Sequence, residues 1–278
     1  MPIRPVLWVK ESQPTIEGAG VHLHRAFGEP NAALDPFLLL DDFGSDDPAD
    51  YVAGFPWHPH RGIETITYLL AGQVDHGDSL GNKGVIGPGD VQWMTAGGGI
   101  IHQEMPKAIA PMRGFQLWAN LPAAHKMMRP RYRDVAAATI PLVEAGAGVQ
   151  VRVVCGDVGG VRGPVTDIVT DPEYLDVRLA ADAVFEHPLP AGKNGFAYVF
   201  EGGASFGDDG TKAERGRLVV FGDGDRARIA AGAKGARFLL VSGRPLKEPV
   251  AWGGPIVMNT REELMQAFEE YRNGTFIR

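Results

Sequence analysis

Four side chains that can bind a metal ion occur as two closely spaced pairs. His58 and His60 belong to the segment Trp57-His58-Pro59-His60, and His102 and Glu104 follow the three glycines of residues 97–99. In an extended strand, residues i and i+2 point to the same face. The members of each pair therefore project together, and two such strands lying side by side inside a barrel bring three imidazoles and one carboxylate to one point. We predict that these four residues hold one metal ion.

This donor set suits a divalent first-row transition metal. Imidazole favours iron, nickel, copper, cobalt or zinc, and the carboxylate also admits manganese. Four protein ligands leave two positions of an octahedral ion for water, dioxygen or substrate, whereas a tetrahedral zinc ion has none left. The residues alone do not choose among these metals.

Glu64 follows the first pair and, like His58 and His60, has an even number in the chain. On one continuous strand its side chain would therefore point to the same face as theirs. It is either a fifth ligand or a carboxylate that accepts the second N–H of a ligating histidine. We favour the second role, because ligating histidines usually donate that N–H to such a partner.

The remaining histidines lack a matching second pair. His22 and His24 lie in the alternating segment Val21–Phe27, which predicts the polar face of a strand. His76 lies in a turn-like stretch, and His125 and His187 are isolated. We expect these three to be surface residues.

Most of the chain is predicted to form short strands bounded by Gly, Pro, Asn or Asp. Tyr68–Gly72 resembles Tyr198–Gly202, and the turn Gly87–Asp90 resembles Gly222–Asp225 at nearly the same offset. These similarities indicate one duplicated β-unit. We predict an all-β protein with two tandem jelly-roll barrels.

The second repeat has Pro188, Pro190 and Asn194 where the first has His58, His60 and Glu64. It cannot assemble the same site, so one metal ion per chain is expected. We place the domains at residues 1–135, 136–253 and 254–278. In the last segment Thr260 and Glu263 predict a capping box that begins an amphipathic packing helix.

Composition and charge argue against several classes of function. The 278 residues carry a net charge of −7 and no dense Lys/Arg run, which argues against direct nucleic-acid binding. Cys155 is the single cysteine, so no intrachain disulfide forms. Neither a signal core nor a membrane span is recognisable, and a cytoplasmic protein is expected.

The chain resembles the pirin family, whose members are bicupins. Strong similarity covers about residues 35–130 and returns at 254–272. The matching motifs are His58-Pro59-His60-Arg61-Gly62-Ile63-Glu64-Thr65, the stretch from Gly87 to Gly97, His102-Gln103-Glu104-Met105-Pro106, Gln116-Leu117-Trp118, and Gly254-Pro255-Ile256-Val257-Met258-Asn259-Thr260. The resemblance implies that His58, His60, His102 and Glu104 bind the metal, usually iron, that the second cupin is metal-free, and that the C-terminal helix packs back on the first domain.

Two functions are associated with this family. Some members cleave the flavonol quercetin with dioxygen; by analogy the 3-hydroxyl oxygen would bind the metal, and Glu104 would accept its proton as the catalytic base. Other members act as metal- or redox-dependent partners of transcription factors or metabolic enzymes. We favour the dioxygenase, because an open metal site inside a barrel suits small-molecule chemistry. A regulator without turnover, bound to a protein partner, is the alternative.

Overall fold

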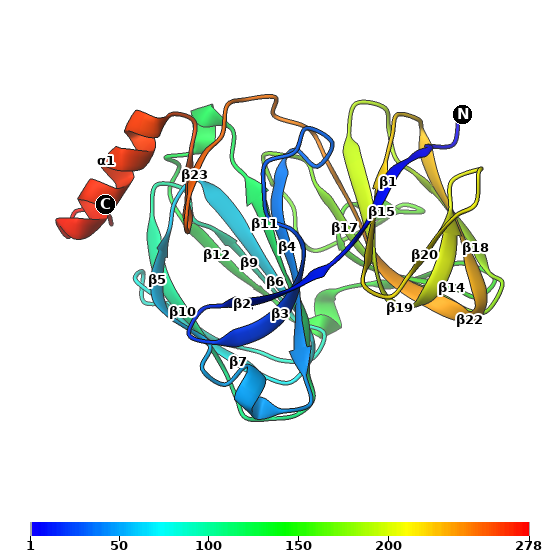
Figure 1. The fold of residues 1–278 in the computed structure, drawn as a ribbon, viewed down its shortest axis with the longest axis horizontal. Helices are drawn as coiled ribbons and strands as arrows, with labels where there is room; N and C mark the ends of the chain where they lie inside the picture. The colour runs from blue at the N-terminus through cyan, green and yellow to red at the C-terminus, as the bar shows by residue number, and fades with distance from the viewer. Residues whose placement is uncertain (1, 278) are drawn as a thin grey trace. The chain divides into compact units, whose positions relative to one another are not determined.

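The computed structural model describes residues 2–277, and within them strands dominate (Figure 1). Backbone contacts divide the chain into two units. We call the unit of residues 14–30, 37–137 and 247–278 the first barrel, and the unit of residues 1–13, 31–36 and 138–246 the second barrel. The domain limits predicted from the sequence treat each domain as one stretch of chain, and these contact units do not follow such stretches.

The first barrel has two main sheets, besides the two-stranded sheet of β23 (Ala251–Gly253) and β24 (Ile256–Met258). The seven-stranded sheet has the order β12 (Arg131–Val135), β9 (Val91–Thr95), β6 (Ile63–Ala71), β11 (Met112–Asn120), β4 (Phe37–Ser45), β3 (Val21–Phe27) and β2 (Gln13–Glu17). The four-stranded sheet has the order β5 (Phe55–His60), β10 (Ile100–Pro106), β7 (Val74–Asp78) and β8 (Lys83–Ile86). Thr67 of the larger sheet contacts Glu104 of the smaller one, so the inner faces of the two sheets pack against each other.

The second barrel is built on one nine-stranded sheet. Its strands are β1 (Val6–Glu11), β21 (Arg217–Phe221), β19 (Asn194–Phe206), β22 (Arg226–Gly243), β17 (Glu173–Leu179), β14 (Val149–Cys155) and β13 (Leu142–Gly146), with β18 (Val184–Pro188) beside β22 and β20 (Thr211–Glu214) beside β19. The short hairpin of β15 (Asp157–Val158) and β16 (Val161–Arg162) completes it. The predicted all-β architecture with two tandem barrels is confirmed.

Helical structure is scarce. Residues 2–277 contain the α-helix α1 (Arg261–Arg272) and three single turns of 3-10 helix at Pro48–Asp50, Ala123–His125 and Ala137–Thr139. The predicted capping box is present, with the Glu263 N–H donating to Thr260 Oγ1 and the Glu263 side chain accepting from the Thr260 N–H. In this part of the chain no helix is both long and apolar enough to span a membrane.

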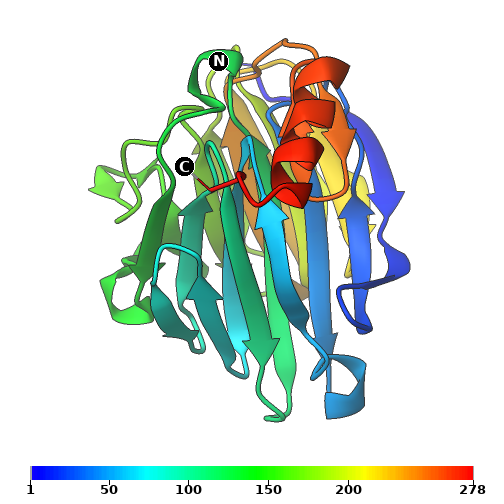
Figure 2. The same ribbon diagram turned by 90° about the vertical axis from the view of Figure 1, so that its left-hand side faces the viewer.

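Helix α1 belongs to the first barrel, where it packs beside β23 (Ala251–Gly253) and β24 (Ile256–Met258) (Figures 1 and 2). Ala267 is buried in a cluster with Ile256, Met258 and Phe276. Arg61, which is 2% exposed, donates to Glu270 at 2.7 Å and to the Phe276 carbonyl at 2.9 Å. The predicted return of the helix to the first domain is confirmed.

The Arg61–Glu270 pair gives a stability prediction. Glu270→Ala removes the carboxylate that lies 2.7 Å from the buried Arg61 guanidinium. We expect the free energy of unfolding to fall by about 2–3 kcal/mol, near the lower limit for broken buried pairs because Glu270 keeps some contact with water. The matched control is Glu269→Ala at an exposed neighbouring position. This substitution should change the free energy of unfolding by less than about 0.5 kcal/mol. Chemical denaturation measures both, and equal losses would show that the pair does not anchor α1.

Candidate metal centre

Two neighbouring strands bring three predicted ligands together. β5 and β10 are antiparallel neighbours, and His58 lies directly opposite His102 in their register. His60 is two residues further along β5 and therefore projects to the same side as His58. Residues directly opposite on paired strands share a face, so the three imidazoles converge as the spacing predicted.

The imidazoles form a compact group. Ring centroids lie 4.4 Å apart for His58 and His102, 4.9 Å for His60 and His102, and 4.8 Å for His58 and His60. One ring nitrogen from each residue lies within 4.8 Å of the other two, so the triad could hold a metal ion.

The hydrogen bonds of His58 and His60 show that a cation fits between them. His58 Nδ1 lies 2.8 Å from the Pro56 carbonyl and His60 Nδ1 lies 3.0 Å from the Pro255 carbonyl. A carbonyl only accepts, so both Nδ1 atoms carry the proton, and both Nε2 atoms present a lone pair. Those lone pairs face each other at 3.0 Å, which is repulsive unless a positive ion lies beside both. Nitrogen atoms that bind one ion at about 2.1 Å and at a right angle are about 3.0 Å apart.

His102 supports the same conclusion. It is fully buried, and neither ring nitrogen has a hydrogen-bond partner within residues 2–277. Buried polar groups are almost always satisfied, and a coordinated ion would satisfy one of these nitrogens.

Burial also keeps the triad in the form that binds metal. Desolvation lowers the pKa of His58, lowers that of His102 strongly, and lowers the pKa of His60 to about 3. The neighbouring imidazoles lower the pKa values of His60 and His102 further. At neutral pH all three rings are therefore neutral, with lone pairs available.

Glu104 lies two residues after His102 on the same strand and is 7% exposed. Its Oε1 accepts a hydrogen bond from Thr67 Oγ1 at 2.8 Å, and burial raises its pKa to about 7. The compact group of ligand atoms contains the three histidines without this carboxylate. The assignment of Glu104 as fourth ligand stays a prediction.

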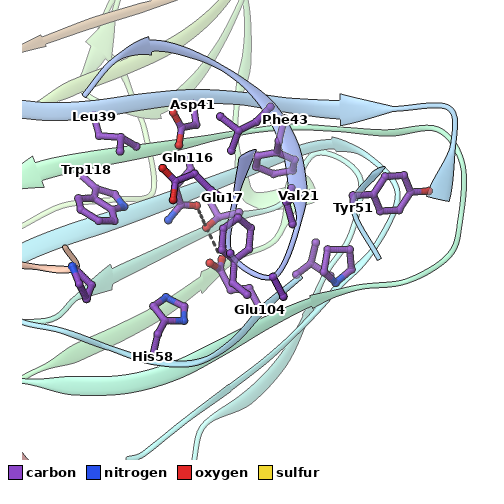
Figure 3. A pocket seen from close by; sticks show the side chains of 18 of the residues that line it. Glu17, Val21, Leu39, Asp41, Phe43, Tyr51, His58, Glu104, Gln116 and Trp118 are labelled. Carbon is purple, nitrogen blue, oxygen red and sulfur yellow. Dashed lines mark hydrogen bonds between the residues drawn. The ribbon is translucent and has the colours of Figure 1, made fainter. Parts of the chain in front are cut away.

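A cavity of about 620 Å³ opens beside the triad. His58, His60 and Glu104 form part of its wall, and Figure 3 shows His58 and Glu104 on one side with Trp118 and Gln116 on the other. Most of the lining is apolar, with aromatic rings among it. A ligand in this cavity would therefore meet the triad directly.

Glu64 lies elsewhere, and this geometry does not support its predicted role. The chain turns at Gly62, where φ is +79°, before β6 begins, so parity does not carry over from β5. Thr67 of β6 lines the cavity, and Glu64, three residues away on the same regular strand, points to the opposite face. There its Oε1 accepts from Thr95 at 2.6 Å and lies 3.8 Å from Arg131.

The carbonyl that orients His60 comes from a distant segment that sequence reasoning missed. Lys126 Nζ, buried at 2% exposure, donates to the carbonyls of Gly62 and Val257 and to Asn120 Oδ1, at 2.6–3.1 Å. These bonds fasten the turn after His60 to strand β24, next to Pro255. The C-terminal segment thus sets the orientation of one imidazole of the triad.

The expectations for the other histidines are partly wrong. His22, His24 and His125 are exposed, as predicted. His76 is buried: its ring stacks on Tyr132 at 4.8 Å and lies 5.4 Å from that of His102. Its position on β7 next to β10 places it inside the barrel.

His187 is also buried, and it bonds Glu173 at 3.0 Å in the second barrel. A turn-like or isolated setting in the sequence therefore did not predict exposure for either residue.

Substitution of the triad should abolish metal retention. We expect wild-type protein to keep one ion per chain after loading with Fe(II) without oxygen and gel filtration, and His58→Ala and His102→Ala to keep none. Free metal at a concentration of about 100 times its Kd should raise the free energy of unfolding of the wild type by about 2.7 kcal/mol and leave that of both variants unchanged. The matched control is His24→Ala, an exposed histidine. Elemental analysis and thermal unfolding measure these outcomes, and full retention by His102→Ala would contradict the assignment.

Lys126→Met tests the link from the C-terminal segment to His60. Methionine keeps the apolar stem but leaves buried carbonyls without their donor, so we expect a loss of about 2 kcal/mol in unfolding free energy and about 10-fold weaker metal binding. His125→Ala, in the same 3-10 turn but exposed, is the control. Unchanged metal affinity in a destabilised Lys126→Met protein would show that the segment does not orient His60.

Comparisons with known proteins identify the family. Residues 20–119 match the family model Pirin, and residues 174–277 match that of the Pirin C-terminal cupin domain. A pirin-like protein of Caulobacter vibrioides is 48% identical over 99% of this chain and 100% of its own length, and human pirin is 41% identical over 94% and 90%. A crystal structure of quercetin 2,3-dioxygenase from Acinetobacter baumannii is 31% identical, with a TM-score of 0.92 over 99% of this chain and 98% of the other. The chain belongs to the pirin family.

Proposed function

We propose that this protein is a metal-dependent dioxygenase that cleaves quercetin-type flavonols with dioxygen, using Fe(II) or another divalent transition metal. The observation that carries the proposal is that the wall of the cavity contains His58 and His60 of the triad. Its volume of about 620 Å³ lies within the range of about 300–1,000 Å³ that holds small aromatic ligands. The similar Acinetobacter structure bears the name of this activity.

The residues around the cavity suit this chemistry. A bound transition metal would lower the pKa of a coordinating hydroxyl and supply single-electron chemistry towards dioxygen. Glu104 Oε1 is held by Thr67, while Oε2 makes no hydrogen bond within the described residues. We assign Oε2 as the atom that accepts the flavonol hydroxyl proton. The apolar lining excludes water from the reacting edge of the substrate.

A purely regulatory role would not need this space. A pirin that acts only by contact with a partner protein could have a closed or shallow metal site, whereas here the triad adjoins an open cavity. The volume of the cavity beside the triad therefore favours turnover over regulation alone.

An aerobic assay of the iron-loaded protein against a flavonol panel tests the proposal. We expect consumption of dioxygen together with loss of the flavonol absorbance, and loss of at least about 100-fold in rate for Glu104→Gln, the scale of a lost general base. His58→Ala should be inactive and His24→Ala fully active. Turnover that survives His58→Ala would reject the mechanism, and absence of turnover with every flavonol by fully loaded wild type would reject the substrate class.

A further inference from the structure

Four polar residues lie side by side across the inner face of the larger sheet. Arg25 of β3 is directly opposite Asp41 of β4, Asp41 is opposite Gln116 of β11, and Gln116 is opposite Thr67 of β6. We call Arg25, Asp41, Gln116 and Thr67 the polar row. All four line the cavity, and Figure 3 shows Asp41 and Gln116 across from His58.

Three hydrogen bonds hold the charged end of the row together. Arg25 donates from Nε and Nη2 to the two carboxylate oxygens of Asp41, at 2.8 and 2.7 Å, and from Nη1 to Glu17 at 2.8 Å. Asp41 is 5% exposed. A buried ion pair of this kind seldom stabilises a fold more than apolar residues would, so its position in a ligand cavity indicates recognition.

The middle of the row has an open polar group. Gln116 Oε1 lies 2.6 Å from Thr67 Oγ1. The amide nitrogen Nε2 makes no hydrogen bond within residues 2–277, and Gln116 lines the cavity. Arg25 has five N–H groups, and three of them are used. The row can therefore donate to a ligand from Gln116 Nε2 and Arg25, and it can accept at the lone pairs of Asp41 that Arg25 does not use.

The space between the row and the triad is bounded by flat side chains. Trp118 stands edge-on to His60, with ring centroids 5.1 Å apart, and Trp252 lies 5.8 Å from Trp118. Leu39 and Phe43 add apolar surface on β4. Such walls accept planar aromatic rings.

Charge narrows the ligand further. One guanidinium faces the two carboxylates of Asp41 and Glu17, so this end of the cavity has no spare positive charge for an acid. A neutral phenolic hydroxyl, which donates and accepts at once, complements the row better than a carboxylate does.

We propose that the polar row is a second recognition site, which selects flat polyphenols that carry hydroxyl groups away from the edge facing the triad. This inference rests on the proposed function, because that function sets which edge faces the histidines. Specificity among polyphenols then depends on Gln116 and Arg25. The substrate edge that faces the triad does not hold the substrate alone.

The test compares binding of two flavonols without turnover. Quercetin carries hydroxyls distant from its 3-hydroxy-4-keto edge, and 3-hydroxyflavone has that edge alone. We expect iron-loaded wild type, kept without dioxygen, to bind quercetin at least about 10-fold more tightly, the scale of one or two hydrogen bonds. Gln116→Leu and Arg25→Lys should each reduce this ratio several-fold. Calorimetry or equilibrium dialysis measures both dissociation constants.

Leu39→Ala is the matched control, because it removes apolar contact from the same face without touching the row. It should weaken both flavonols alike and leave the ratio unchanged. A ratio that stays at the wild-type value in Gln116→Leu would overturn the second site and leave the proposed function standing. If neither flavonol binds the loaded wild type, the proposed function fails as well. Should Arg25→Lys not fold, Gln116→Leu decides alone.

Discussion

The first barrel is organised around two lone pairs that face each other. His58 and His60 each donate Nδ1–H to a backbone carbonyl, and their Nε2 atoms are thereby directed at each other across 3.0 Å. In water such a pair would separate or take up a proton. Here desolvation lowers the pKa of both rings, and strand β5 holds them, so a shared cation is the remaining way to relieve the repulsion.

That constraint extends well beyond the strands that carry the ligands. The carbonyl that fixes His60 belongs to Pro255, and the segment around it is tied to the turn at Gly62 through Lys126. Arg61, next to His60, holds helix α1 through Glu270. Packing of the C-terminal helix and orientation of the His60 imidazole are therefore linked by contacts on two adjacent residues. This explains why the last segment of the chain folds with the first barrel.

Local sequence patterns predicted the parts of this site that depend on local geometry. The i, i+2 rule placed His58 with His60, because that rule holds within one regular strand. The rule does not extend to Glu64, because the turn at Gly62 lies between β5 and β6 and changes the side to which the residues of β6 point. The burial of His76 could not be read from its turn-like neighbours, since it follows from pairing of β7 with β10. Pairing across the sheet likewise creates the polar row, whose members are scattered along the chain.

The second barrel has the same architecture but lacks the histidine triad. Its interior is a continuous apolar cluster that includes Phe185, Leu189, Phe206 and Phe238. Its buried histidine, His187, is satisfied by Glu173, and the histidine triad of the first barrel is the one ligand group of three found within residues 2–277. Apolar packing makes a barrel stable, whereas a cavity gives up part of that packing. The first barrel keeps both the cavity and the polar row, and a ligand that fills the space beside the triad would restore the lost packing.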